Sequence, residues 1–197
     1  MDKIIKIFKE QKGYARMLEM KKKGIHTRSI KKAVDNGTIE KIKPGLYKLV
    51  DYPWDEHETF VDIYNANKKA VICLLSAAAY WELTTYIPNQ TDVAVPMNTG
   101  KFNLDYPPTK IYYFSKIYYS EGIESIKTKS GVFNIYNKEK TICDLFRYQK
   151  KIGEDLILES LKTYIRDRKN RSIPKLLEYA EIHKVTNKLQ PLLKGML

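Results

Sequence analysis

The chain has 197 residues, a formal net charge of +12, 43% hydrophobic residues and 29% charged residues. This length fits one large domain or two small ones, and the hydrophobic content is sufficient for a buried core. No apolar run resembles a signal peptide or approaches the ~20 residues of a membrane span. The two cysteines, Cys73 and Cys143, provide no disulfide framework. We therefore expect a cytoplasmic protein with reduced thiols and no membrane partner.

The positive charge is concentrated in the first fifty residues, which hold 14 Lys and Arg against 5 Asp and Glu, a net charge of +9. The rest of the chain holds 21 Lys and Arg against 18 Asp and Glu, a net charge of only +3. A basic segment joined to a nearly balanced body is typical of a module that docks on a polyanion. The sequence predicts a DNA-binding domain at 1–50, a linker at 51–58 and a second domain at 59–197.

We call residues 1–50 the head. Its first part is predicted to form two short helices. Apolar spacing favours a helix over 3–11 that ends at Gly13. A second helix is expected over 14–22, with Ala15 and Leu18 facing inward.

A third helix is predicted between Thr27, a suitable N-cap, and Asn36-Gly37, a typical stop signal. Its apolar residues fall at i, i+3 and i+4, and its cations fall on the opposite side of the helix. The apolar face is formed by Ile30, Ala33 and Val34, and the cationic face by Arg28, Lys31 and Lys32. One face is expected to pack on the first two helices, which leaves the other for solvent or a DNA groove.

Two short strands are predicted around Pro44-Gly45, whose residue types suit the centre of a type II turn. Lys41 and Lys43 flank the turn, and Lys48 lies on the return strand. Three helices followed by a basic hairpin predict a winged helix-turn-helix, in which the third helix enters the major groove and the hairpin, or wing, contacts the backbone. The expected DNA-binding residues are Thr27, Arg28, Ser29, Lys31, Lys32, Lys41, Lys43, Lys22 and Lys23.

A solvated, purely structural head is the alternative interpretation of these lysines. For Lys21–Lys23 taken alone it is the simpler one, because lysine-rich helix ends are common. The combination of helix spacing, basic third helix and Pro-Gly hairpin favours DNA binding.

The body predicts a mixed α/β domain with a helical C-terminus, so the whole chain, with its N-terminal winged helix-turn-helix, is expected to be of the α+β class. A helix is expected at 59–67, a buried strand or helix start at 70–75 and a helix at 76–83. Strands are expected at 91–96 and 110–114, a hairpin at 123–127 and 132–136, a helix at 137–148, and helices from Gly153 onward, one of them opened by Pro174. Residues 51–58 are expected to form a linker. Its acidic part, 55–58, has residue types that could hold a metal ion, but a hydrated acidic linker is the favoured interpretation.

The sequence offers little support for a catalytic site, a cofactor or a metal. Asn98–Lys101 lacks the first glycine and the final hydroxyl of a phosphate-binding loop. The histidines are far apart and the cysteines form no CxxC pair, so a zinc site has no support. The triplet Glu19–Lys21 lacks the carboxylate strand that a nuclease needs, and Cys143 reads as a buried, inert thiol. We expect a protein that is not an enzyme.

Several segments of the head and the body resemble those of one protein family. The head segment GIHTRSIKKAVDNGTIEKIKPGLYKL resembles the N-terminal winged helix of that family. In the body, AVICLLSAAAYWELT, TDVAVP and NKEKTICDLFR resemble the family's strand and small-residue helix, the strand after them, and a later helix. In these segments the chain resembles the AbiEi-like antitoxins of type IV toxin–antitoxin (abortive infection) systems, and the resemblance covers most of its length.

The resemblance implies a repressor of its own operon that binds repeated operator sites in its promoter. It also implies an antitoxin that counteracts a nucleotidyltransferase-like toxin without requiring a stable complex. Two alternatives stay open: a winged-helix regulator whose body senses a small ligand, and a nucleic-acid-processing enzyme. A neighbouring toxin gene would favour the antitoxin and repressor. A pocket with polar groups would favour the ligand-sensing regulator, and a cluster of acidic residues would favour the enzyme.

Overall fold

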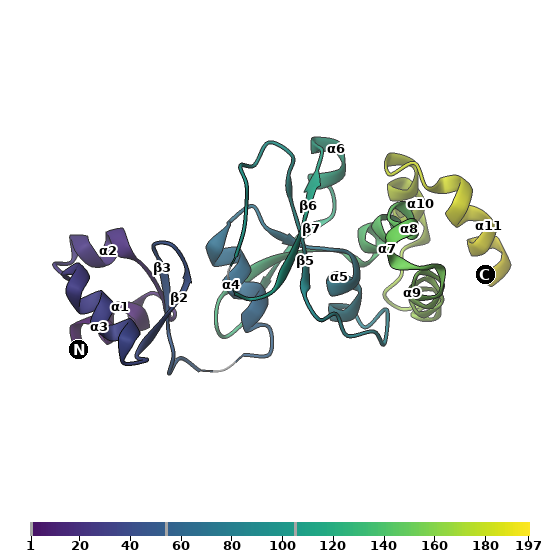
Figure 1. Ribbon diagram of the computed structural model, residues 1–197. Helices are drawn as coiled ribbons and strands as arrows, with labels where there is room; N and C mark the ends of the chain where they lie inside the picture. Colours follow the sequence, from purple (N-terminus) through teal and green to yellow (C-terminus); the bar gives the residue numbers. More distant parts are fainter. Residues whose placement is uncertain (1, 54, 105) are drawn as a thin grey trace. The chain divides into compact units, whose positions relative to one another are not determined.

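The computed structural model describes residues 2–53, 55–104 and 106–197, which form two compact units of mixed α and β structure (Figure 1). Unit 1 contains the first 68 residues together with 103–108 and 126–133. Unit 2 contains 69–102, 109–125 and 134–197. The α+β fold class expected from the sequence is confirmed, but unit 1 extends well beyond the fifty residues of the head.

In unit 1 the head folds as helices packed on a small sheet. Its elements are α1 (Asp2–Glu10), β1 (Tyr14–Arg16), α2 (Met17–Lys22), α3 (Thr27–Asp35), β2 (Ile39–Lys43) and β3 (Leu46–Leu49). The antiparallel sheet has the order β1-β3-β2. The predicted first and third helices and the two strands of the hairpin are confirmed.

The prediction of a helix over 14–22 is wrong in its first turn. Residues 14–16 form β1, which pairs with β3 through Tyr14 opposite Lys48 and Arg16 opposite Leu46. Pairing with a distant strand overrides the local helical pattern, which carries no information about that partner. Because α2 begins at Met17, its phase differs from the expected one: Met20 is buried and Leu18 is 71% exposed.

The two faces of the small sheet are covered by different elements. On one face, Ile39, Tyr47 and Leu49 pack with residues from α1, α2 and α3. The other face carries Tyr14, Leu46 and Lys48, because side chains alternate along a strand. It lies against α4 (Glu58–Ala66), which contributes Asp62 as a partner of both Tyr14 and Lys48.

The segment that contains 126–133 covers a further part of α4. The Phe60 and Phe133 ring centroids lie 5.2 Å apart, and a side chain at Gly131 would come within 2.7 Å of Val61.

Asp55 is buried and accepts hydrogen bonds from the backbone N–H groups of His57 at 2.9 Å and Ser130 at 3.2 Å. Although burial raises the pKa of Asp55, these hydrogen bonds lower it overall. The expectation of a hydrated acidic linker at 51–58 is therefore wrong at Asp55.

Unit 2 is built on the larger sheet, whose strand order is β6-β5-β4-β8-β7. Its strands are β4 (Val71–Ile72), β5 (Thr91–Pro96), β6 (Thr109–Phe114), β7 (Ile123–Lys127) and β8 (Val132–Tyr136); the ends of β7 and β8 extend into unit 1. β5 runs parallel to β6 and antiparallel to β4. For residues 70–75 the sequence left open whether a strand or the start of a helix forms. The segment contains both, because β4 is followed by the first residues of α5 (Leu74–Tyr80).

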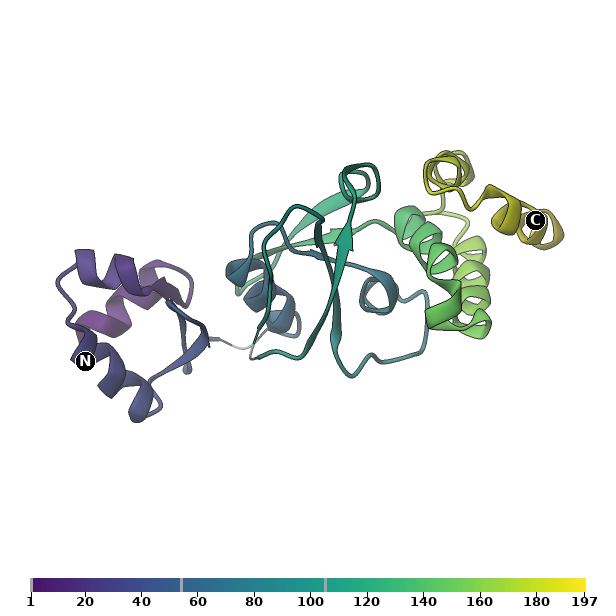
Figure 2. The same cartoon turned by 45° about the horizontal axis from the view of Figure 1, so that its top comes forward.

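Helices form the rest of unit 2. They are α6 (Lys116–Tyr119), α7 (Lys138–Arg147), α8 (Gln149–Ile152), α9 (Glu154–Arg166), α10 (Ile173–Ile182) and α11 (Thr186–Met196). α7 and α9 pack alongside each other (Figure 2). The predicted helix opened by Pro174 is confirmed as α10. Cys143 is buried, and burial raises the pKa of its thiol.

A charged cluster is buried on α7. Lys140 and Asp144 form an ion pair whose side chains are both 0% exposed. Asp144 Oδ1 also lies 3.6 Å from Arg147 Nη2 and 3.5 Å from His183 Nδ1. Burial, with the charges of Lys140 and Arg147, lowers the pKa of His183 to about 3. This histidine is therefore neutral at physiological pH.

Candidate nucleic-acid interface

The turn between α2 and α3 is fixed by its backbone and by one buried side chain. Gly24 has φ = +79°, a conformation that suits glycine after a helix end. The Ile25 N–H donates to the Met20 carbonyl at 3.0 Å, and the Ile25 side chain is buried in the core of the head. The orientation of α3 relative to α2 is thus set by core packing.

α3 begins at Thr27, with His26 rather than Thr27 as its N-cap residue. The expected N-cap is therefore wrong by one position: His26 has the extended backbone of an N-cap residue, and its carbonyl accepts a hydrogen bond from the Ile30 N–H at 3.2 Å. The predicted stop is confirmed: Asn36 is the C-cap, Gly37 has φ = +70°, and the Thr38 N–H donates to the Ala33 carbonyl at 2.9 Å.

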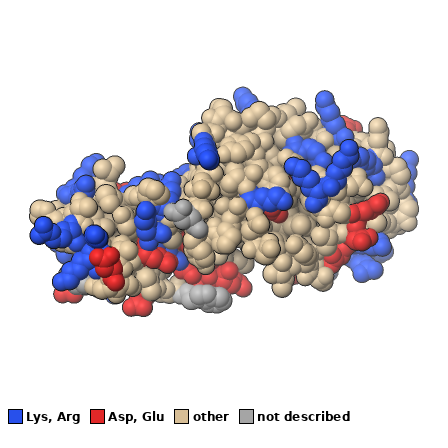
Figure 3. All heavy atoms as spheres, viewed as in Figure 1, with Lys and Arg blue, Asp and Glu red and all other residues tan. Residues whose placement is uncertain are grey.

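The polar face of α3 is exposed, and its apolar face is buried. Ile30 and Ala33 are 1% and 0% exposed, and Val34 is half-buried against the same core. The exposed residues are Thr27, Arg28, Ser29, Lys31 and Lys32. Figure 3 shows several Lys and Arg side chains on the visible surface of the head, with Asp and Glu gathered toward its lower edge. The structure thus brings the five expected residues of α3 onto one accessible surface.

Lys22 and Lys23, at the end of α2, are both exposed. Lys23 Nζ lies 2.9 Å from Glu10 Oε2, and this contact lowers the pKa of Glu10. Since both side chains of the pair are more than 40% exposed, the pair is weak. A phosphate could replace Glu10 as the partner of Lys23 at little cost.

The hairpin is less basic on its surface than its sequence indicates. The turn itself has the expected shape, with Gly45 at φ = +80°. Lys41 is exposed, but Lys43 is half-buried and donates a hydrogen bond to the Ala66 carbonyl at the end of α4. Burial and the nearby Arg16 lower the pKa of Lys43. The expected pair of surface lysines is therefore reduced to Lys41.

Arg16 is a cation at the hairpin that the sequence interpretation missed. It is exposed, it is opposite Leu46 in the sheet, and the next residue, Met17, donates its N–H to Gly45 of the turn at 2.9 Å. The sequence pattern placed residues 14–16 in a helix and not in a strand. Arg16 therefore had no predicted relation to the hairpin. With β1 in place, Arg16 and Lys41 are the exposed cations of the small sheet.

Lys48 is buried and forms ion pairs with acidic residues. It contacts Glu58, and its Nζ lies 3.4 Å from Asp62 Oδ2 and 3.8 Å from Glu40 Oε1. The Tyr14 hydroxyl donates a hydrogen bond to Asp62 Oδ1. Burial, opposed by the Tyr14 and Lys48 contacts, raises the pKa of Asp62 to about 6. Lys48 thus holds the hairpin to α4 and is not part of the exposed surface.

Within residues 2–53, 55–104 and 106–197, no three His, Cys, Asp or Glu side chains form a group that could hold a metal ion. In the same ranges, no helix is long and apolar enough to span a membrane.

The sequence matches no protein-family model, and a search of curated proteins found no match.

Proposed function

We propose that the chain is a DNA-binding repressor whose head acts as a winged helix-turn-helix. The observation that carries this proposal is the exposed polar face of α3, where Arg28, Lys31 and Lys32 lie opposite the buried Ile30 and Ala33. In this role α3 enters the major groove, Arg28 contacts base edges, and the other cations contact phosphates. Arg16 and Lys41 contact the backbone beside the groove.

The test is a titration of the full chain against a duplex from the region upstream of its own gene and against a random duplex. The double variant Lys31→Ala/Lys32→Ala should bind both duplexes more weakly, and the slope of log K against log salt should fall by about 2. The matched control is Lys150→Ala/Lys162→Ala, which removes two exposed lysines of unit 2. Equal behaviour of the two double variants would contradict the proposal.

We further propose, from the resemblance to AbiEi-like proteins, that unit 2 counteracts a nucleotidyltransferase-like toxin encoded by a neighbouring gene. In the repressor proposed above, the small sheet and its helices bind the DNA, which leaves unit 2 free for a second activity. In a strain that expresses the neighbouring gene, Lys31→Ala/Lys32→Ala should still restore growth although it represses the promoter more weakly. Loss of rescue in this variant would assign the antitoxin activity to the head as well.

A further inference from the structure

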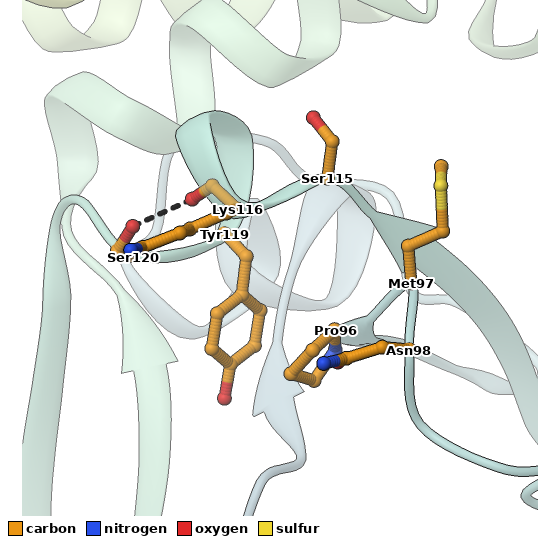
Figure 4. A pocket seen from close by; sticks show the side chains of 7 residues that line it. All are labelled: Pro96, Met97, Asn98, Ser115, Lys116, Tyr119 and Ser120. Atoms are coloured by element: carbon orange, nitrogen blue, oxygen red, sulfur yellow. Dashed lines mark hydrogen bonds between the residues drawn. The ribbon is translucent and has the colours of Figure 1, made fainter.

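A cavity of about 670 Å³ lies in unit 2, at the end of two parallel strands. β5 ends at Pro96 and β6 ends at Phe114, and the Met97 N–H donates to the Phe114 carbonyl at 2.8 Å. The described lining residues are Pro96, Met97, Asn98, Ser115, Lys116, Tyr119 and Ser120 (Figure 4). The carboxyl ends of parallel strands are where ligands bind in open α/β sheets, and the volume is in the range of small-molecule sites.

The walls of the cavity are apolar and partly rigid. The Tyr119 ring extends from α6 on the same side as Pro96 and Asn98 (Figure 4). Its hydroxyl donates to the Lys69 carbonyl at 2.8 Å, and its own carbonyl accepts from the Tyr136 hydroxyl at 2.9 Å, so both ends of the residue are held. A fixed aromatic ring offers a stacking surface, and the neighbouring Met97, 64% exposed, offers a thioether that favours aromatic contacts.

The polar groups of the cavity favour an anion. Lys116 is the one charged side chain among the seven lining residues, and none of the seven is acidic. It is exposed, and within the described residues it has no ion-pair partner. The hydroxyl of Ser120 is already used, because it donates to the Lys116 carbonyl at 2.5 Å. Ser115 and Asn98, which also line the cavity, supply further hydrogen-bonding groups.

We propose that this cavity binds a small aromatic molecule with one anionic group, such as an aryl carboxylate, sulfonate or phosphate. Its ring stacks between Tyr119 and Pro96, and its charge lies beside Lys116. The proposal concerns unit 2 alone and stands or falls independently of DNA binding by the head.

The test uses two fluorescent probes of the same aromatic shape on the full chain: anilinonaphthalene sulfonate, which is anionic, and phenylnaphthylamine, which is uncharged. Both should bind saturably with one site per chain. Lys116→Met should weaken the sulfonate about fivefold, the upper range for an exposed ion pair, and leave the uncharged probe within about twofold. The matched control is Lys101→Met, which removes an exposed lysine three positions after Asn98 that is not among the lining residues and should change neither probe.

A second variant tests the position of the ring. Met97→Trp adds bulk at a largely exposed position, so the fold should persist, and it should weaken both probes at least about tenfold. Unchanged thermal unfolding in all three variants shows that the site rather than the fold was altered. Non-saturable binding, or equal effects of Lys116→Met and Lys101→Met on the sulfonate, would overturn the proposal.

Discussion

Arg28 is the second residue of α3, exposed on the side of the helix opposite Ile30 and Ala33. An arginine in the first turn of a recognition helix can place its planar fork on guanine O6 and N7. Arg28→Ala should therefore cost about 1–3 kcal/mol on the cognate duplex and much less on random DNA. Fluorescence anisotropy titrations against both duplexes measure the difference. Equal losses on both would show that Arg28 contacts phosphate and does not read sequence.

Asp62 links the stability of unit 1 to pH. Its pKa in the folded chain is about 6, against an ordinary value of 3.8, so between these values the folded state holds a proton that the unfolded state releases. Protonation of Asp62 therefore stabilises the folded state. This stabilisation is fully present below about pH 3.8 and is lost as the pH rises through 6. Tyr14, Lys48 and Glu58 face the carboxyl group and share in this balance.

The variant Asp62→Asn should lack this dependence. As pH falls from 7 to 4, the wild-type chain should gain stability relative to the variant by up to about 3 kcal/mol, which is the shift of about two pKa units. Urea unfolding followed by circular dichroism at several pH values measures the difference. A difference between the two chains that stays constant across this window would show that the carboxyl titrates normally.

At the scale of elements, the hairpin separates two lysines that look equivalent in the sequence. Lys41 is exposed, whereas Lys43 caps the C-terminus of α4 through the Ala66 carbonyl. Lys41→Ala should weaken binding to cognate and random DNA alike and reduce the salt slope by about 1. Lys43→Ala should leave both affinities unchanged and lower the free energy of unfolding by about 1 kcal/mol. The reverse outcome would place Lys43 at the DNA.

The elements show which features a sequence pattern can predict. α3 was predicted with its two faces because a helix of this kind depends on local spacing and on the stop at Asn36-Gly37. The strand at 14–16 was missed because its cause, pairing with β3, lies thirty residues away. The role of Lys43 was missed for the same reason, since a lysine pattern does not reveal that a later helix ends beside it. The five exposed residues of α3 were predicted, and Arg16 was not.

At the scale of the molecule, the first fifty residues are an incomplete unit. Ile42 and Leu46 are 1% and 3% exposed, yet neither belongs to the core that the helices of the head share. A fragment ending at residue 50 would lack α4 and expose the Ile42 and Leu46 side chains. Burial of each contributes about 1.5–3 kcal/mol to the free energy of unfolding. Fifty residues carry only about 2–8 kcal/mol of stability, so the fragment should unfold at far lower urea concentration than the full chain. Matching urea midpoints would show that the head is independent of α4.

The contacts that complete unit 1 also have an order in time during synthesis. Asp55 and Ser130, whose hydrogen bond helps to cover α4, lie 75 positions apart in the chain. At about 5–20 residues per second, a ribosome takes about 4–15 s to pass from one to the other. Throughout that interval the nascent chain holds α4 without the covering segment, and Val61 and Phe60 lack their later neighbours Gly131 and Phe133. A chaperone that binds exposed apolar helices would find its target on the ribosome at this stage and lose it once residue 133 emerges.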